Sequence, residues 1–201
     1  RHDSIYLSSG CRTFNNTGYL MAGYRPIQSS AYPANFVIDK VDGDGAFAAG
    51  VNFSNEYNIM DSNAVFPCAN GTQQKYCYGL TAIETNNLGQ GESYAIAGAH
   101  RTGIFFATLD QVGNVIKTYR WQLPFPWTFQ SYNRRPFIYE SRVNPGYYYI
   151  CGDYERMAYV LCVDATGAGA YANQIWANFY NNNNWLEAHA LIESPYNPGE
   201  L

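Results

Sequence analysis

Short apolar runs alternate with turn residues along the whole chain. Residues 36–41, 94–99, 104–109 and 147–151 are rich in branched and aromatic side chains, and Gly, Asn, Asp or Pro residues separate such runs. Branched and aromatic side chains fit a pleated sheet, whereas Gly supplies the positive φ of tight turns. The pattern therefore predicts an all-β protein.

The pattern of strands also repeats. Three segments align, reading GYLMAG at 18–23, SYAIAG at 93–98 and YYYICG at 147–152. Each precedes a second apolar run that ends in Asp-x-x-Gly, at Asp42, Asp110 and Asp164. In the first copy the spacing between the motif and the Asp is longer, which indicates a longer hairpin around Pro26 to Pro33.

Two more strands complete each unit. Ile83-Glu-Thr, Tyr139-Glu-Ser and Ile192-Glu-Ser mark a preceding strand, and stretches such as 115–121 and 171–176 mark a following one. Four antiparallel strands that recur every ~50 residues are typical of β-propeller blades. The expected blades span 3–53, 79–123 and 136–180. A partial fourth blade covers 186–201, with its first strand at 186–194.

The sequence Gly-Tyr-x-x-Ala-Gly, then Asp-x-x-Gly and a Trp, resembles the tandem blades of secreted bacterial-type β-propeller repeat proteins. This resemblance implies a single propeller-type repeat domain over 1–201 and secretion, far more than any activity. The first copy departs from it, since no Trp follows Gly45 directly and segment 54–78 intervenes. A helix over 182–192 is the alternative to the fourth-blade strand, because Trp185, Ala188, His189 and Ile192 share a helical face.

Charge and composition exclude several classes of protein. Only 14% of the residues are charged, the net charge is −4 and 17% are aromatic. An acidic chain with few Lys and Arg does not suit nucleic-acid binding, and a disordered chain would hold fewer aromatics. No run approaches the ~18 apolar residues of a membrane-spanning helix.

Five cysteines suggest a disulfide framework. Cys68 and Cys77 bracket a short polar loop, and we expect Cys151 and Cys162 to face one another across a hairpin. Two disulfides would indicate an oxidising compartment. The alternative is buried free thiols. No C-x-x-C or His pair completes a zinc site.

Catalytic motifs are absent from the sequence, so we expect neither an enzyme nor a cofactor. Glu84, Glu140 and Glu193 could suggest a carboxylate pair, but they occupy the same place in successive units, which indicates a structural role. The acidic segment 39–45 lacks the full spacing of a calcium loop, so a turn is the favoured interpretation and no metal site is expected.

A loop between two blades offers the best binding candidate. It brings together Trp127, Phe129, Tyr132, Arg134 and Arg135, and exposed aromatics with Arg are typical of binding surfaces. The alternative is that these side chains cover the blade ends as core. Three N-x-S/T sequons, at Asn15, Asn52 and Asn70, are candidate glycosylation sites.

These observations predict an extracellular or cell-surface structural protein that binds copies of itself. We expect a subunit of a head-to-tail filament or surface layer, in which the unfinished fourth blade contributes to the contact. The alternative is a secreted carbohydrate- or protein-binding propeller that uses the 124–135 loop. A glycan-cleaving enzyme ranks third, and nucleic acid and a membrane span are not expected.

Overall fold

A computed structural model describes most of the chain. The described residues are 6–13, 18–26, 34–44, 54–57, 77–85, 93–100, 103–122, 136–154, 157–180, 186, 188–197 and 200–201. All regular structure among them is β-strand, so the prediction of an all-β chain is confirmed.

Within the described ranges, twelve strands form three antiparallel sheets of four strands each. The first sheet contains β1 (Tyr6–Arg12), β2 (Gly18–Pro26), β3 (Ala34–Asp42) and β4 (Ser54–Tyr57). The second contains β5 (Cys77–Glu84), β6 (Tyr94–His100), β7 (Gly103–Leu109) and β8 (Val115–Gln122). The third contains β9 (Phe137–Glu140), β10 (Tyr147–Tyr154), β11 (Met157–Asp164) and β12 (Asn173–Tyr180).

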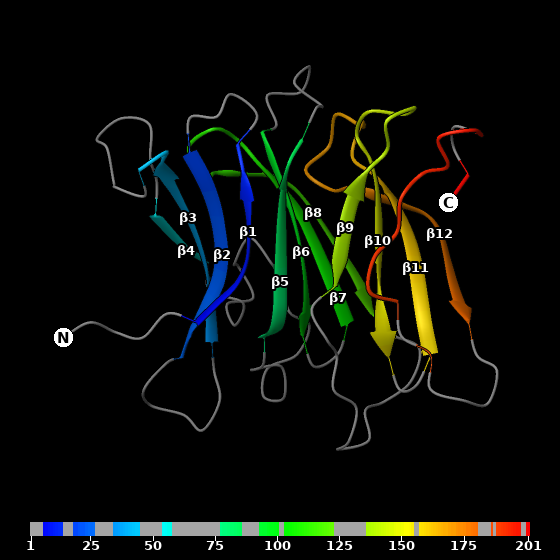
Figure 1. The fold of residues 1–201 in the computed structure, drawn as a ribbon, viewed down its shortest axis with the longest axis horizontal. Coiled ribbons are helices and arrows are strands. Elements are labelled where there is room, and N and C mark those ends of the chain that lie inside the picture. The colour runs from blue at the N-terminus through cyan, green and yellow to red at the C-terminus, as the bar shows by residue number, and fades with distance from the viewer. Residues whose placement is uncertain are drawn as a thin grey trace.

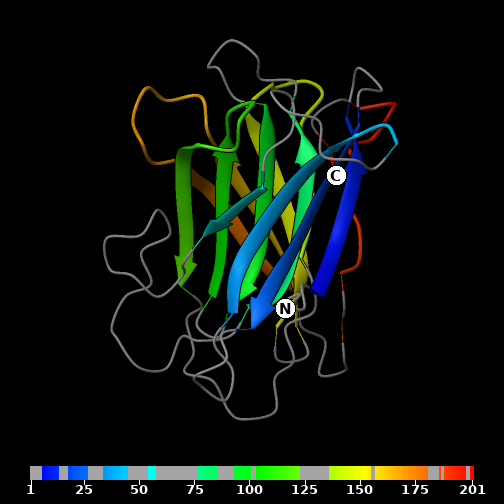
Figure 2. The same ribbon diagram turned by 90° about the vertical axis from the view of Figure 1, so that its left-hand side faces the viewer.

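The three sheets follow one another along the long axis of the molecule, as Figure 1 shows. Figure 2, viewed from the end of the first sheet, shows the other two sheets behind it. The first strands are neighbours, since β1 contacts β5 and β5 contacts β9. Ser9 Oγ accepts the N–H of Ala82 at 3.1 Å, and Thr81 Oγ1 donates to the carbonyl oxygen of Pro136. The described strands form no closed ring.

The structure differs from the sequence prediction in one strand boundary and in one expected strand. The fourth strand of the first sheet lies at 54–57, beyond the expected limit of residue 53, because β4 begins opposite Asp39 and pairs with residues 36–39 of β3 rather than starting directly after the Asp42 turn. The described residues of 186–194 form neither a strand nor the alternative helix.

The Asp-x-x-Gly turns are held by the Asp side chain. Asp110 Oδ1 accepts the N–H groups of Val112 (2.9 Å) and Asn114 (2.8 Å), and Gly113 has a φ of 83°. The positive φ predicted for the glycine is thus confirmed at Gly113. At Gly167 it is wrong, because the chain there continues through the longer loop 166–170.

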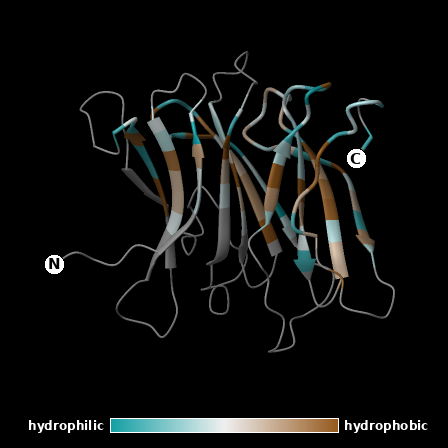
Figure 3. Cartoon of the chain, viewed as in Figure 1, coloured by the Kyte–Doolittle hydropathy of each residue, from teal (hydrophilic) through white to brown (hydrophobic). Residues whose placement is uncertain are grey.

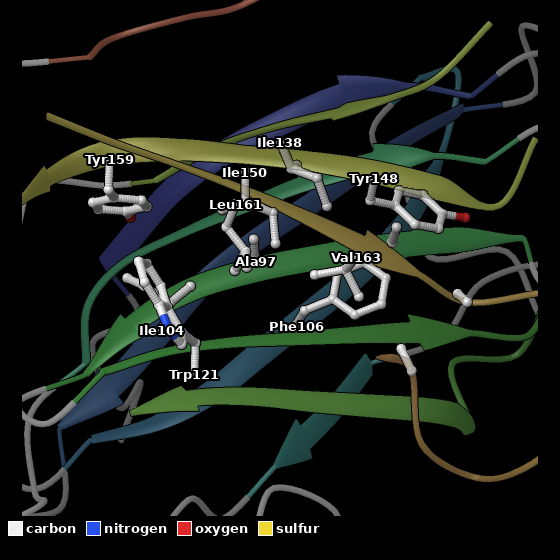
Figure 4. Packing of buried hydrophobic residues seen from close by; sticks show 13 residues of the cluster. Ala97, Ile104, Phe106, Trp121, Ile138, Tyr148, Ile150, Tyr159, Leu161 and Val163 are labelled. Carbon is white, nitrogen blue, oxygen red and sulfur yellow. The ribbon is translucent and has the colours of Figure 1, made fainter. Parts of the chain in front are cut away.

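Two apolar layers separate the sheets. Leu20, Ala22 and Ile38 of the first sheet pack against Ile96 and Ala107 of the second. The layer between the second and third sheets is larger and contains Phe106, Trp121, Tyr148, Tyr159 and Leu161, which Figure 4 shows pointing toward one another. Figure 3 shows apolar residues along the strands and hydrophilic residues at the turns of one end. Burial of these layers is the main force that holds the sheets together.

The glycine that ends each aligned motif has a packing role in the third sheet. Gly152 lies directly opposite Tyr159 in the β10–β11 pair. A Cβ added at Gly152 would lie 2.5 Å from Tyr159 Oη and 2.8 Å from Cζ. The missing side chain therefore makes the space into which the tyrosine ring folds. Phe105 lies opposite Gly98 in the same way.

The two tryptophans that follow the Asp-x-x-Gly turns are not equivalent. Trp121 lies opposite Ile104 and packs between Tyr159 (ring centroids 5.5 Å apart) and Phe179 (5.1 Å). Trp176 lies opposite Cys162, nearer the turn, and contacts Tyr149 on the other face of the third sheet (6.0 Å). Their similar spacing in sequence therefore does not predict a shared position.

Candidate functional site at the C-terminal side of the third sheet

The C-terminal segment (described residues 186, 188–197 and 200–201) contains a turn that matches one in the third sheet. In the third sheet the N–H of Ser141 donates to the carbonyl oxygen of Tyr147 at 2.8 Å, and Ser141 Oγ accepts the N–H groups two and three residues later. In the C-terminal segment the N–H of Ser194 donates to the carbonyl oxygen of Glu200 at 2.6 Å, and Ser194 Oγ likewise accepts the N–H groups two and three residues later. Both turns have one geometry because their sequences match.

Glu193 anchors the C-terminal segment to the third sheet. Its carboxylate accepts Ser141 Oγ–H at 2.5 Å and the N–H of Arg142 at 2.7 Å, and the residue is buried. Cys151 Sγ donates to the carbonyl oxygen of Ala188 at 3.9 Å. These two hydrogen bonds join the C-terminal segment to the turn after β9, so this side chain fixes the segment at its turn.

The other side of the C-terminal segment is open. No described residue hydrogen bonds to the backbone of Ala190 or Ile192. Three apolar side chains of the segment are exposed: Ile192 is 59% exposed, Tyr196 90% and Leu201 50%. In the second unit, Ile83 stands in the place of Ile192 and packs against the core between the second and third sheets. The segment therefore presents an exposed apolar edge whose backbone at Ala190 and Ile192 has no hydrogen-bond partner among the described residues.

Cys151 and Cys162 lie on the face of the third sheet beneath this segment, but they are free thiols in the structure. Cys151 lies opposite Val160, and Cys162 lies opposite Tyr149, so the two cysteines are diagonal neighbours rather than a facing pair. Cα atoms of such diagonals are roughly 7–8 Å apart, beyond the usual span of a disulfide. The expected facing arrangement is therefore corrected.

The described thiols are poor nucleophiles. Burial raises the pKa of Cys151 to about 11, and burial together with nearby Asp164 raises the pKa of Cys162 to about 12. Burial and the Glu84 carboxylate raise the pKa of Cys11 to about 11. All three thiols are protonated at neutral pH, which suits packing rather than thiolate chemistry or metal binding.

The three aligned glutamates belong to separate units. Glu140 Oε1 accepts the N–H of Gly146 (3.1 Å) within its own sheet, whereas Glu193 bonds to the preceding sheet. Burial raises the pKa of Glu84, and Lys40 opposes that shift. Lys40 Nζ also lies 5.5 Å from the centre of the Tyr94 ring. Each of the three carboxylates thus has different partners, which agrees with separate structural roles.

Among the described residues, no group of three or more His, Cys, Asp or Glu side chains could hold a metal ion. In the segment considered for calcium, Asp42 Oδ1 accepts the N–H of Asp44 at 3.1 Å, as in a turn. His189 is exposed. The described residues also include no helix long and apolar enough to cross a membrane.

Several predicted site residues lie outside the described residues. They are the loop residues Trp127, Phe129, Tyr132, Arg134 and Arg135, the sequons at Asn15, Asn52 and Asn70, Cys68, and the side chain of Cys77, whose backbone begins β5. The binding loop, the glycosylation sites and the Cys68–Cys77 disulfide therefore stay predictions.

Comparison with protein-family models, curated proteins and solved structures finds no match to this chain.

Proposed function

We propose that this protein is an extracellular structural or interaction subunit that assembles with copies of itself, head to tail. The open C-terminal segment is the observation that carries this proposal. The segment follows the third sheet where a next first strand would lie, yet no described residue hydrogen bonds to its backbone at Ala190 and Ile192, and the Ile192 side chain is exposed. A neighbouring copy that covers them would bury apolar surface and pair these backbone groups.

We further propose that the three sheets are consecutive blades of a propeller-type repeat. All three have the same strand order along the chain, and their first strands are neighbours. The same turn recurs at the next step of the repeat, at Ser194. In such an arrangement the uncovered side of the last unit is the natural place for the next subunit.

The extracellular location rests on composition. The chain has few charged residues and many Tyr and Asn residues. Such a surface suits contact with other subunits or sugars, because charge repulsion that keeps proteins monomeric is weak. The test is surface labelling of intact source cells with a reagent that cannot cross the membrane. Labelling of this chain supports the location, and labelling only after lysis contradicts it.

The assembly itself can be tested with one exposed residue. We expect sedimentation velocity of the wild type to show species that grow with concentration, and Ile192→Lys to shift them toward the monomer, because a charge must then be buried in the contact. Val143→Lys is the matched control, since Val143 is also exposed but lies on the turn after β9 rather than on the C-terminal segment. If both variants sedimented alike, the C-terminal segment would not be part of the contact between subunits.

A further inference from the structure

The outermost strand of the third sheet has an unpaired edge. β12 pairs with β11 along one side, and no described residue pairs with β12 along the other. Figure 1 shows β12 at one end of the row of sheets, with no labelled strand beyond it. An edge of this kind offers a row of N–H and C=O groups to any strand that can approach it.

The outermost strands of the other two sheets are protected. β4 has only four residues and includes Glu56. The segment before β12 covers part of the edge of β8. The N–H of Thr118 donates to the carbonyl oxygen of Ala170 (3.0 Å), and the N–H of Ala172 donates to the carbonyl oxygen of Thr118 (2.9 Å). Tyr119 Oη adds a hydrogen bond to Gln174 at 2.5 Å. Short length, charge and covering are the usual devices that prevent edge-to-edge pairing.

β12 is neither short nor charged, and no described strand covers its outer edge. It has eight residues, NQIWANFY, with no Pro or Gly, and the chain holds no charged residue between Asp164 and Glu187. Ile175 is 48% exposed, Tyr180 is 50% exposed, and Tyr171 just before the strand is 70% exposed. An uncharged segment with aromatic, branched and amide side chains has the composition that favours strand pairing between molecules.

We propose that β12 is an interaction surface for a second copy of this chain, and that the β12 strands of two copies pair antiparallel about a two-fold axis. The third sheets of both copies then form one continuous sheet. This inference rests on the proposed function, since it names one contact of the self-assembly. It involves a different surface from the C-terminal segment.

The partner is a second copy because an uncharged edge is complementary to itself. In a two-fold antiparallel pair the same backbone groups meet from both sides, and no like charges are brought together. Exposed Ile175 and Tyr180 of one copy can then cover apolar surface on the other. A partner with charged strand residues would gain no ion pair from this edge, because it offers no charge.

Asn178 gives the sharpest test. It is exposed and lies in the second half of β12, so a two-fold axis through the middle of the strand, between Trp176 and Ala177, places it opposite Ile175 of the other copy. We expect Asn178→Lys to raise the dimer dissociation constant by at least about tenfold, because it introduces two like charges into one strand pair, each opposite an apolar side chain. Gln111→Lys is the matched control, since it adds the same charge at an exposed turn of the second sheet.

The experiment is sedimentation equilibrium of the full chain and both variants, at one salt concentration. Loss of the dimer in Asn178→Lys but not in Gln111→Lys supports the inference. Self-association that is equal in all three proteins overturns it and leaves the proposed function standing. A wild type that is monomeric at every concentration overturns both.

A second measurement does not depend on the folding of a variant. Hydrogen exchange of the wild-type chain should show protection of β12 amides that rises with protein concentration, because pairing blocks their exchange. Protection of β12 that is independent of concentration would contradict the inference, provided that the chain self-associates over the same range.

Discussion

Substitution of Gly152 by alanine tests the packing of the third sheet directly. The new methyl group would lie 2.5 Å from Tyr159 Oη, 2.8 Å from Cζ and 3.0 Å from Cε1. Tyr159 is buried and held edge-on against Trp121, so its ring cannot simply turn away. Overpacking of this kind costs roughly 1–3 kcal/mol, and the loss of glycine flexibility in the unfolded chain returns about 0.4–1 kcal/mol.

The expected result is a net destabilisation of about 1–2 kcal/mol, which corresponds to a melting temperature lower by roughly 2–8 °C for a chain of this size. Differential scanning calorimetry measures it. Gly169→Ala is the control, because the nearest atom to its added Cβ is 3.9 Å away, and we expect no loss of stability. Tyr159→Phe removes the closest atom, so it should partly rescue Gly152→Ala in a double-mutant cycle. A melting temperature of Gly152→Ala equal to the wild type would refute the reasoning.

Three further predictions concern buried polar groups. Tyr148→Phe should lower the free energy of unfolding by about 1–2 kcal/mol in chemical denaturation, because the hydroxyl makes a hydrogen bond with Thr85 Oγ1 (2.5 Å) in a buried site. Tyr19→Phe at an exposed site is the control and should leave the free energy of unfolding unchanged. Alkylation after unfolding without reductant, read by mass spectrometry, should modify both Cys151 and Cys162; a Cys151–Cys162 disulfide peptide would contradict the register. Stability should fall between pH 9 and about 11, because thiols of the unfolded chain ionise from 9.0 upward while buried Cys151 stays protonated. Cys151→Ala should reduce that fall, and an unchanged pH profile in this variant would count against the assignment.

Much of the fold could be predicted from the sequence because the repeat is local. The GYLMAG, SYAIAG and YYYICG motifs correspond to β2, β6 and β10, and the Asp-x-x-Gly turns follow β3, β7 and β11. Residues 140–146 and 193–199 are also similar in sequence, and Ser141 and Ser194 make the same turn hydrogen bonds. Backbone pattern and turn chemistry lie within a few residues of one another, so sequence alone reveals them.

Features that depend on registration across strands could not be predicted in the same way. One register step decides whether Cys151 and Cys162 face each other or lie diagonally. The longer connection between β11 and β12 places Trp176 opposite Cys162, whereas Trp121 lies opposite Ile104, and a register shift occurs at the same step of both sheets. The uncharged run that includes β12 is visible in the sequence. Its meaning appears only when the topology places that strand at an unprotected edge.

The most direct test of the whole account is electron microscopy of the native particle, negatively stained at neutral pH and near-physiological salt. Self-assembly predicts particles that contain several copies, with straight or curved chains of subunits joined end to end and their number rising with concentration. A uniform field of single 22.6 kDa particles at every concentration would contradict it.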